Sequence, residues 1–325
     1  MSGLPTFGDI EKAHLRLMGD VVRTPLLRSD LLDQIAKRKV WVKAECLQYT
    51  GSFKYRGARY RILSMTDEQC QNGVVAYSSG NHAQGVALAA SKRGVECLIV
   101  MPSDTPKVKV EGVRRLGGEV RFYDRLHENR EQIAAAIAAD TGAVLIPPFD
   151  DFHVICGQGS VGMEVAEQFA EKNESLQAVV INAGGGGLTA GVGLALEYLP
   201  ALKIYTAEPN EFDDHRRSFI SGIRQKNAKL SGSICDALMA EQPGHMTFEI
   251  NKNKVTAGLA VTDEQVLSAM KFAFTHLKIV LEPGGAASLA AALNGLIPGT
   301  GSVCVIATGG NVDPVLFTQA IADPC

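Results

Sequence analysis

One lysine lies between two aromatic side chains in the segment TGSFKYRGA, residues 50–58. A lysine amine is protonated and a poor nucleophile at neutral pH, so a reactive lysine needs desolvation or nearby cations. Around Lys54, the rings of Phe53 and Tyr55 could supply apolar cover, and Arg56 could supply positive charge. From these residues alone, a solvated lysine in a basic segment is the simpler interpretation. A functional role for Lys54 therefore depends on partners elsewhere in the chain.

Four consecutive glycines follow a predicted buried strand in the segment NAGGGGLTAG. Asn182 ends this strand, and a helix is expected to begin near Leu188. Glycines at such a turn let backbone N–H groups converge on one point, where the helix dipole also favours an anion. We therefore predict a phosphate-binding loop made by Gly184, Gly185, Gly186 and Gly187.

The same glycines leave a dinucleotide site open as an alternative. Residues 185–190 fit the pattern G-x-G-x-x-A, and Glu208 follows 23 residues after Gly185, at the end of the next predicted strand. Against this alternative, the motif lies in the second half of the chain, and no acid or base suited to hydride transfer lies nearby. A dinucleotide-binding oxidoreductase is therefore a remote alternative.

A second polar turn, SSGNHAQG, follows the predicted strand at residues 74–78. Serine and asparagine at a helix start are ordinary caps, and a single histidine there is more often structural. Grouped around one glycine, however, these donors can hold a carboxylate. The candidate residues are Ser79, Gly80, Asn81 and His82.

Two further turns carry polar residues at predicted strand ends. In ATGGNVD, Thr308 ends the last strand. In AEPNEFDD, the side chains of Glu208 and Asp214 and the carbonyl group of Phe212 could surround a hard cation with oxygen atoms. Solvated acidic loop residues are the simpler interpretation of that segment.

The elements that position these turns alternate between strands and helices. From residue 74 to residue 149, four apolar runs alternate with three stretches of helical period, and the pattern breaks at Pro147 and Pro148. A second block with the same alternation follows, ending in a strand at residues 302–308. Such alternation predicts right-handed crossovers and parallel sheets covered on both faces.

We therefore predict an α/β protein of two domains, each a largely parallel twisted sheet flanked by helices. The first 73 residues are expected to pack on the second sheet. This gives a large domain of residues 1–75 and 152–325 and a small, mobile domain of residues 76–151 that closes over the substrate. The apolar content of the large domain favours a homodimer.

Composition excludes several classes of partner. The 325 residues hold 32 basic and 35 acidic side chains, so no basic patch for nucleic acid or an acidic membrane is expected. The seven cysteines show no metal-site spacing and are expected to be free thiols in the cytoplasm. Residues 178–196 are uncharged, but their glycines favour a strand, a loop and a helix over a membrane span.

Five motifs in order resemble one known family. SFKYRGA, SSGNHAQG, AGGGGL, EPGGAA and TGGNVD are similar to the signatures of the serine/threonine dehydratase and serine racemase group of fold-type II pyridoxal phosphate (PLP) enzymes. This group includes 3-hydroxyaspartate dehydratases and has the tryptophan synthase β-like fold. The resemblance covers nearly the whole chain, from RTPL at residue 23 onward.

The resemblance implies roles for the candidate residues. Lys54 forms the Schiff base with PLP and acts as general base, and Phe53 lies against the pyridine ring. Asn81 binds the ring hydroxyl, and Thr308 meets the ring nitrogen. The glycine loop binds the phosphate group, and residues 79–82 receive the substrate carboxylate. Glu208, Phe212 and Asp214 match the magnesium or manganese site of racemase-like members.

The implied reaction is β-elimination from a hydroxy amino acid, giving a 2-oxo acid and ammonia. A hydroxyl such as that of Thr308 does not keep the ring nitrogen protonated, which favours prompt loss of the leaving group over a long-lived carbanion. Ser79, expected on the opposite face of the cofactor, makes racemisation the alternative activity. A catalytically idle regulatory relative would lack the lysine, and Lys54 is present.

The identity of the substrate stays open among serine, threonine and 3-hydroxyaspartate. The segment REQIAAAIAADTG has alanines where racemase-like relatives can carry an arginine, near Ala136. The resemblance therefore does not imply a contact to a second substrate carboxylate. An added carboxylate nevertheless requires a dedicated partner. The candidates for that partner are Arg125, His127, His153 and Arg216.

Overall fold

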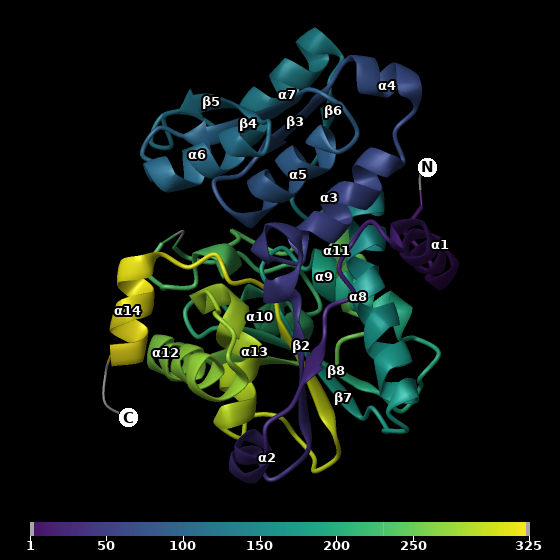
Figure 1. Ribbon diagram of the computed structural model, residues 1–325, viewed down its shortest axis with the longest axis vertical. Helices are drawn as coiled ribbons and strands as arrows, with labels where there is room; N and C mark the ends of the chain where they lie inside the picture. The colour runs from purple at the N-terminus through teal and green to yellow at the C-terminus, as the bar shows by residue number, and fades with distance from the viewer. Residues whose placement is uncertain (1–2, 230, 323–325) are drawn as a thin grey trace.

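The computed structural model describes residues 3–229 and 231–322, which form two sheets covered by helices (Figure 1). The larger sheet is parallel except for its first strand and has the order β1 (Leu26–Leu27), β2 (Val40–Ala44), β10 (Val303–Ala307), β7 (Ala178–Asn182), β8 (Lys203–Pro209) and β9 (Ala257–Val261). The smaller sheet is parallel throughout and has the order β5 (Glu119–Tyr123), β4 (Cys97–Pro102), β3 (Val74–Tyr77) and β6 (Val144–Leu145).

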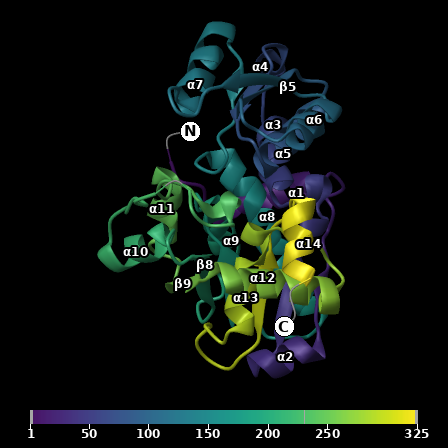
Figure 2. The same ribbon diagram turned by 90° about the vertical axis from the view of Figure 1, so that its left-hand side faces the viewer.

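Helices cover both faces of both sheets, as parallel strands with apolar side chains on each face require (Figure 2). One face of the large sheet packs against α1 (Phe7–Leu17), α8 (Phe152–Glu171), α9 (Gly187–Ala195) and α11 (His245–Asn251). Its other face packs against α2 (Asp30–Ala36), α12 (Asp263–Phe272), α13 (Pro283–Leu293) and α14 (Pro314–Ala322). The small sheet lies between α7 (Arg130–Thr141) on one face and α3 (Lys54–Leu63), α5 (Asn81–Ser91) and α6 (Lys107–Arg115) on the other.

The remaining helices are short. They are α4 (Asp67–Gln71), α10 (Asp214–Ser221), the 3-10 helices η1 (Glu45–Leu47), η2 (Tyr49–Gly51) and η3 (Asp236–Leu238), and the π-helical turn η4 (Ala273–Leu277). Within the described ranges, no helix is both long enough and apolar enough to cross a membrane. Residues 178–196 form strand β7, the glycine loop and helix α9, as the sequence predicts.

The predicted α/β class with two largely parallel sheets is confirmed. Strands β1, β2 and β9 were not expected individually. Strand β2 (VWVKA) carries Lys43 as its fourth residue, which interrupts the apolar run, and β9 (AGLAV) is rich in alanine and glycine, which are poor strand formers. Both are stabilised by pairing with a neighbouring strand rather than by local preference.

Helix α3 belongs to neither sheet alone. Its side chains Tyr55, Ala58 and Ile62 join the apolar core below the small sheet, and the helix also packs against α8. Helix α8 begins at Phe152, soon after the break at Pro147 and Pro148. A Cβ atom at Gly157 would lie 2.6 Å from the Arg56 carbonyl oxygen, so the glycines that weaken the helix signal are needed for this close crossing.

Candidate active site

A cavity of about 570 Å³ lies where carboxyl ends of strands from both sheets meet. Ligands bind at this edge in parallel α/β sheets because the loops that follow the strands converge there. Its lining includes all the residues expected to form the cofactor and substrate sites, namely Phe53, Lys54, Ser79, Gly80, Asn81, His82, Gly184, Gly185, Gly186, Gly187 and Thr308.

Lys54 is the first residue of α3, and its amine lies inside this cavity. The Lys54 Nζ atom donates a hydrogen bond of 2.7 Å to the Pro148 carbonyl oxygen and lies 5.1 Å from the centre of the Phe53 ring. Burial lowers the pKa of the Lys54 amine to about 8, although the nearby Glu282 carboxylate acts to raise it. A lysine with this pKa is partly neutral at physiological pH and can act as nucleophile and base.

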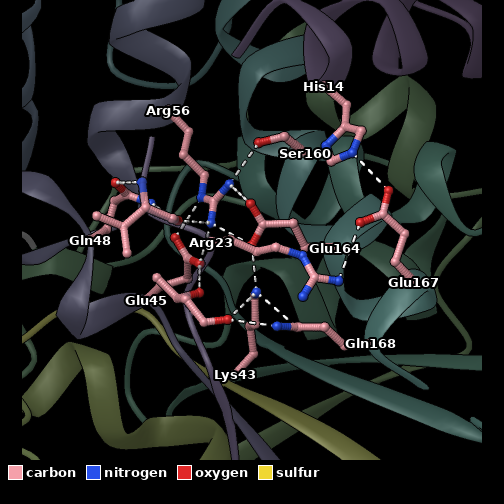
Figure 3. Close-up of polar contacts among 12 residues, drawn as sticks. His14, Arg23, Lys43, Glu45, Gln48, Arg56, Ser160, Glu164, Glu167 and Gln168 are labelled. Carbon is pink, nitrogen blue, oxygen red and sulfur yellow. Dashed lines mark hydrogen bonds and ion pairs between the residues drawn. The ribbon is translucent and has the colours of Figure 1, made fainter. Parts of the chain in front are cut away.

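Arg56 does not supply the positive charge that the sequence suggested. Residues two positions apart in a helix are separated by about 200° around its axis, so Lys54 and Arg56 point in different directions. The Arg56 guanidinium group is fully buried on the other side, where it binds the carboxylates of Glu45 and Glu164 (Figure 3). Desolvation therefore lowers the pKa of Lys54 without help from Arg56.

The turn between β3 and α5 holds Asn81 in one orientation. The Asn81 Nδ2 atom donates to Glu282 Oε1 over 2.5 Å, while Asn81 Oδ1 accepts from Asn311 Nδ2 over 2.7 Å. Burial raises the pKa of the Glu282 carboxyl group to about 8, and the charge of Asp236 raises it further. The EPGGAA and GGNVD motifs contain Glu282 and Asn311, but only the folded chain places both residues beside Asn81.

His82 is a neutral side chain in this turn. Its Nε2 atom donates to the Ile146 carbonyl oxygen over 2.9 Å, and burial, together with the charge of Lys54, lowers the pKa of the ring to about 3. The ring therefore offers no positive charge to a carboxylate. An anion at this turn would therefore have to be held by backbone N–H groups and by the dipole at the start of α5. Among the described residues, none forms a hydrogen bond with the Ser79 hydroxyl, and Ser79 lines the cavity.

The glycine loop has the shape of an anion cradle. Gly186 has a φ of +91°, and a Cβ atom on Gly185 would lie 2.1 Å from the Phe149 ring, so neither position tolerates another residue without rearrangement. Among the described residues, no acceptor binds the N–H groups of Gly185, Gly186 or Gly187. The open N–H groups and the start of α9 fit the phosphate group of PLP.

Thr308 completes the cavity wall at the end of β10. Its hydroxyl accepts a hydrogen bond of 3.0 Å from Asn182 Nδ2, and Asn182 Oδ1 in turn accepts from the Ser288 N–H over 2.6 Å. Both side chains are buried, so the Thr308 hydroxyl has a fixed position. A neutral group at this position suits an unprotonated pyridine nitrogen.

The expected cation residues lie outside the cavity lining, and they are buried instead of solvated. Glu208 accepts the N–H groups of His215 and Arg216, each over 2.9 Å. Burial raises the pKa of Glu208, as does the charge of Asp214, and burial raises the pKa of Asp214 to about 7. The Asp214 Oδ2 atom has no hydrogen-bond partner among the described atoms, so this pair has capacity for a cation. Within the described ranges, no cluster of three or more His, Cys, Asp or Glu side chains forms a complete metal site.

The four residues predicted to bind a second substrate carboxylate lie elsewhere in the structure, so that prediction is wrong. None of them lines the cavity. Arg125 pairs with Asp104, His127 with Asp124 and Arg216 with Asp213, while His153 packs beside Tyr60 and Phe152.

Three other cations line the cavity from the small sheet's helices: Lys109, Arg115 and Arg130. Lys109 Nζ lies 3.3 Å from Asp236 Oδ2. Arg130 starts α7, and its guanidinium group lies 5.6 Å from the centre of the Tyr77 ring. Among the described residues, neither Arg115 nor Arg130 forms an ion pair with a carboxylate. Arg130 lies on the same helix as Ala136, six residues earlier.

Comparisons with known proteins agree with this geometry. A family model described as pyridoxal-phosphate dependent enzyme matches residues 17–309. The chain is 41% identical to an L-threo-3-hydroxyaspartate ammonia-lyase from Pseudomonas sp, covering 95% of this chain and 96% of the relative, and 37% identical to a serine racemase from Arabidopsis thaliana, covering 94% and 92%. The structure of maize serine racemase superimposes with a TM-score of 0.91 at 36% identity, covering 98% of this chain and 97% of that one. The chain therefore belongs to the family of pyridoxal-phosphate dependent enzymes, in the serine/threonine dehydratase and serine racemase group.

Proposed function

We propose that this protein is a PLP-dependent ammonia-lyase that converts a β-hydroxy amino acid to a 2-oxo acid and ammonia. The observation that carries the proposal is a buried lysine with a pKa near 8 in the same cavity as an open glycine loop. When bound, PLP withdraws electrons from the α-carbon of the substrate. The protein's part is to bind, orient and move protons.

The proposed roles follow the geometry of the cavity. The neutral Lys54 amine removes the α-proton, and loss of the β-hydroxyl as water, followed by hydrolysis, releases the oxo acid and ammonia. Phe53 would lie against the cofactor ring, and Asn81 would bind its hydroxyl group. Thr308 would meet the ring nitrogen. The glycine loop holds the phosphate group, and the turn at residues 79–82 receives the substrate carboxylate. Closure of the small domain, residues 76–151, excludes water.

We further propose 3-hydroxyaspartate as the preferred substrate. Arg115 and Arg130 line the cavity without a carboxylate partner in the described chain, which suits a substrate with a second carboxylate. Similarity to a 3-hydroxyaspartate ammonia-lyase agrees with this choice.

Replacing Arg130 with methionine is expected to reduce kcat/KM for 3-hydroxyaspartate about 10- to 100-fold, the usual worth of a hydrogen bond to a charged group. The value for serine should change less than about threefold, because serine has no second carboxylate. Oxo-acid release from both substrates measures the effect. Arg125→Met is the matched control, since Arg125 lies outside the cavity. An equal fall for serine and 3-hydroxyaspartate would contradict the substrate assignment.

Serine racemisation is the second candidate function. It is supported by Ser79, which lines the cavity and whose hydroxyl forms no hydrogen bond within the described chain. A proton removed by Lys54 on one face could be returned by Ser79 on the other. Ser79→Ala is then expected to abolish D-serine formation from L-serine while elimination continues, as chiral chromatography would show. If the variant leaves both reactions unchanged, the second base is not Ser79.

We also propose a magnesium or manganese ion at Glu208, Asp214 and the Phe212 carbonyl group. The buried carboxylates and the unpaired Asp214 Oδ2 atom support this site. A chelator is expected to lower activity, and added magnesium or manganese should restore it. Asp214→Asn should make activity insensitive to both additions. Indifference of the unaltered protein to chelation would count against the cation.

A homodimer in the cytoplasm is proposed as the working state. Phe274, Val280 and Val315 are exposed apolar side chains of the large domain, which suits a subunit interface. The six described free cysteines suit a reducing compartment. Light scattering of the purified protein would test the dimer, and a monomeric mass would exclude it.

A further inference from the structure

Three buried side chains outside the cavity lining support the glycine loop from behind. They come from two neighbouring helices, α10 and α11, and all three have no solvent exposure. A Cβ atom on Gly186 would lie within 3.1 Å of each of them, which shows that they pack directly against the loop. They donate to three successive carbonyl groups: His215 Nε2 to Gly184 at 2.7 Å, Thr247 Oγ1 to Gly185 at 2.8 Å and Asn251 Nδ2 to Gly186 at 3.1 Å.

These contacts fix the direction of the N–H groups on the other side of the loop. In a trans peptide the C=O and N–H bonds point in opposite directions. The carbonyl groups of Gly184, Gly185 and Gly186 share their peptide planes with the N–H groups of residues 185–187. Holding the three oxygens toward α10 and α11 therefore turns the three N–H groups away from those helices, and none of these N–H groups donates to an acceptor in the described chain.

The donors do more than satisfy buried carbonyl groups. Two of them leave their own second polar atom buried without a described partner, His215 Nδ1 and Asn251 Oδ1. An unpaired buried polar atom is destabilising, so a side chain chosen only for packing would be apolar at these positions.

We propose that His215, Thr247 and Asn251 are positioning residues that aim the N–H groups of the glycine loop at the cofactor phosphate. They act through the loop and do not touch the cofactor. The inference rests on the proposed phosphate-binding role of that loop. It predicts a defect confined to the phosphate end of the cofactor.

The test compares PLP with pyridoxal, which lacks the phosphate group, in binding to the cofactor-free protein. Thr247→Val and Asn251→Leu keep approximate shape and remove the donors. Each is expected to weaken PLP binding about 3- to 10-fold, the usual worth of one hydrogen bond, and to leave pyridoxal binding unchanged. The ³¹P signal of bound PLP should also shift. Thr247→Ser keeps the hydroxyl and should retain the original PLP affinity.

Thr206→Val is the matched control, because Thr206 is equally buried and its hydroxyl has no described hydrogen-bond partner. Equal losses for PLP and pyridoxal, or unchanged PLP affinity in both variants, would overturn the positioning role. Glycine-labelled ¹⁵N spectra of the unaltered protein separate this failure from failure of the loop assignment. If PLP and pyridoxal shift the amide signals of residues 185–187 equally, the loop does not bind phosphate. If only PLP shifts them while the variants keep their affinity, the loop assignment holds and the positioning role is wrong.

Discussion

Lys54→Ala is expected to abolish both the visible absorption of the lysine-linked cofactor and measurable oxo-acid formation. Removing a general base alone costs about 10²- to 10⁴-fold in rate, and this lysine also carries the proposed covalent link. Lys109, the other lysine in the described lining of the cavity, is paired with Asp236 and is not expected to replace Lys54. Absorbance spectra and an oxo-acid assay would measure the two losses.

The pKa of Lys54 adds a pH dependence to this prediction. Burial lowers that pKa to about 8, and only the neutral amine attacks an aldehyde. The rate at which the cofactor-free protein reacts with PLP should therefore rise from pH 7 to pH 9 with a midpoint near 8. Without desolvation the midpoint would lie near 10.4, the ordinary lysine pKa.

A matched control separates the site from a general loss of positive charge. Lys92 lies 3.9 Å from the centre of the Tyr49 ring, outside the cavity lining. Lys92→Ala should keep the absorption and activity of the unaltered protein. Full cofactor absorption in Lys54→Ala would mean that another amine holds the cofactor, and the assignment of the site would be wrong.

Much of the cavity could be predicted from the sequence because its parts follow strand ends. The turns after β3, β7 and β10 carry Asn81, the glycine loop and Thr308, and parallel strands bring their carboxyl ends to one edge. These turns can be recognised from the order of the motifs and the pattern of strands, without knowing in which direction any side chain points. This explains why the expected cofactor residues meet in one cavity.

Predictions that depended on side-chain direction were less successful. Arg56 was expected beside Lys54, but helical geometry turns it away and burial pairs it with two carboxylates. The expected cations Arg125 and His127 bind acidic neighbours at the surface, while Arg130, only a few residues along, reaches the cavity. Local sequence does not distinguish these outcomes, because they depend on which helix face packs inward.

The side chains that support the glycine loop were even harder to predict from the sequence. His215, Thr247 and Asn251 follow the glycines by 31, 62 and 65 residues, as counted from their hydrogen-bond partners. None belongs to a motif, and each is an ordinary polar residue on a short helix. Their role becomes visible only because three donors meet three successive carbonyl groups in the folded chain.

Arg56→Met is expected to lower the free energy of unfolding by about 3 to 5 kcal/mol, the usual cost of removing one partner from a buried ion pair. Arg56 makes two-point contacts with both Glu45 and Glu164, at 2.7 to 2.9 Å, and all three side chains are nearly inaccessible to solvent (Figure 3). Methionine would leave Lys43 as the only cation for two buried carboxylates in this cluster. Urea unfolding, followed by circular dichroism, would measure the loss.

Two companion variants test the physical cause. Arg23→Met removes a partly exposed ion pair with Glu171 at the edge of the same cluster and should cost no more than about 1 kcal/mol. In the double variant Arg56→Met with Glu45→Gln, Lys43 still pairs with Glu164 over 2.5 Å, so the cluster is again electrically balanced. The double variant should therefore recover part of the stability lost in Arg56→Met. If the double variant is less stable than Arg56→Met, the lost packing and hydrogen bonds of the guanidinium group, and not an uncompensated buried charge, determine the cost.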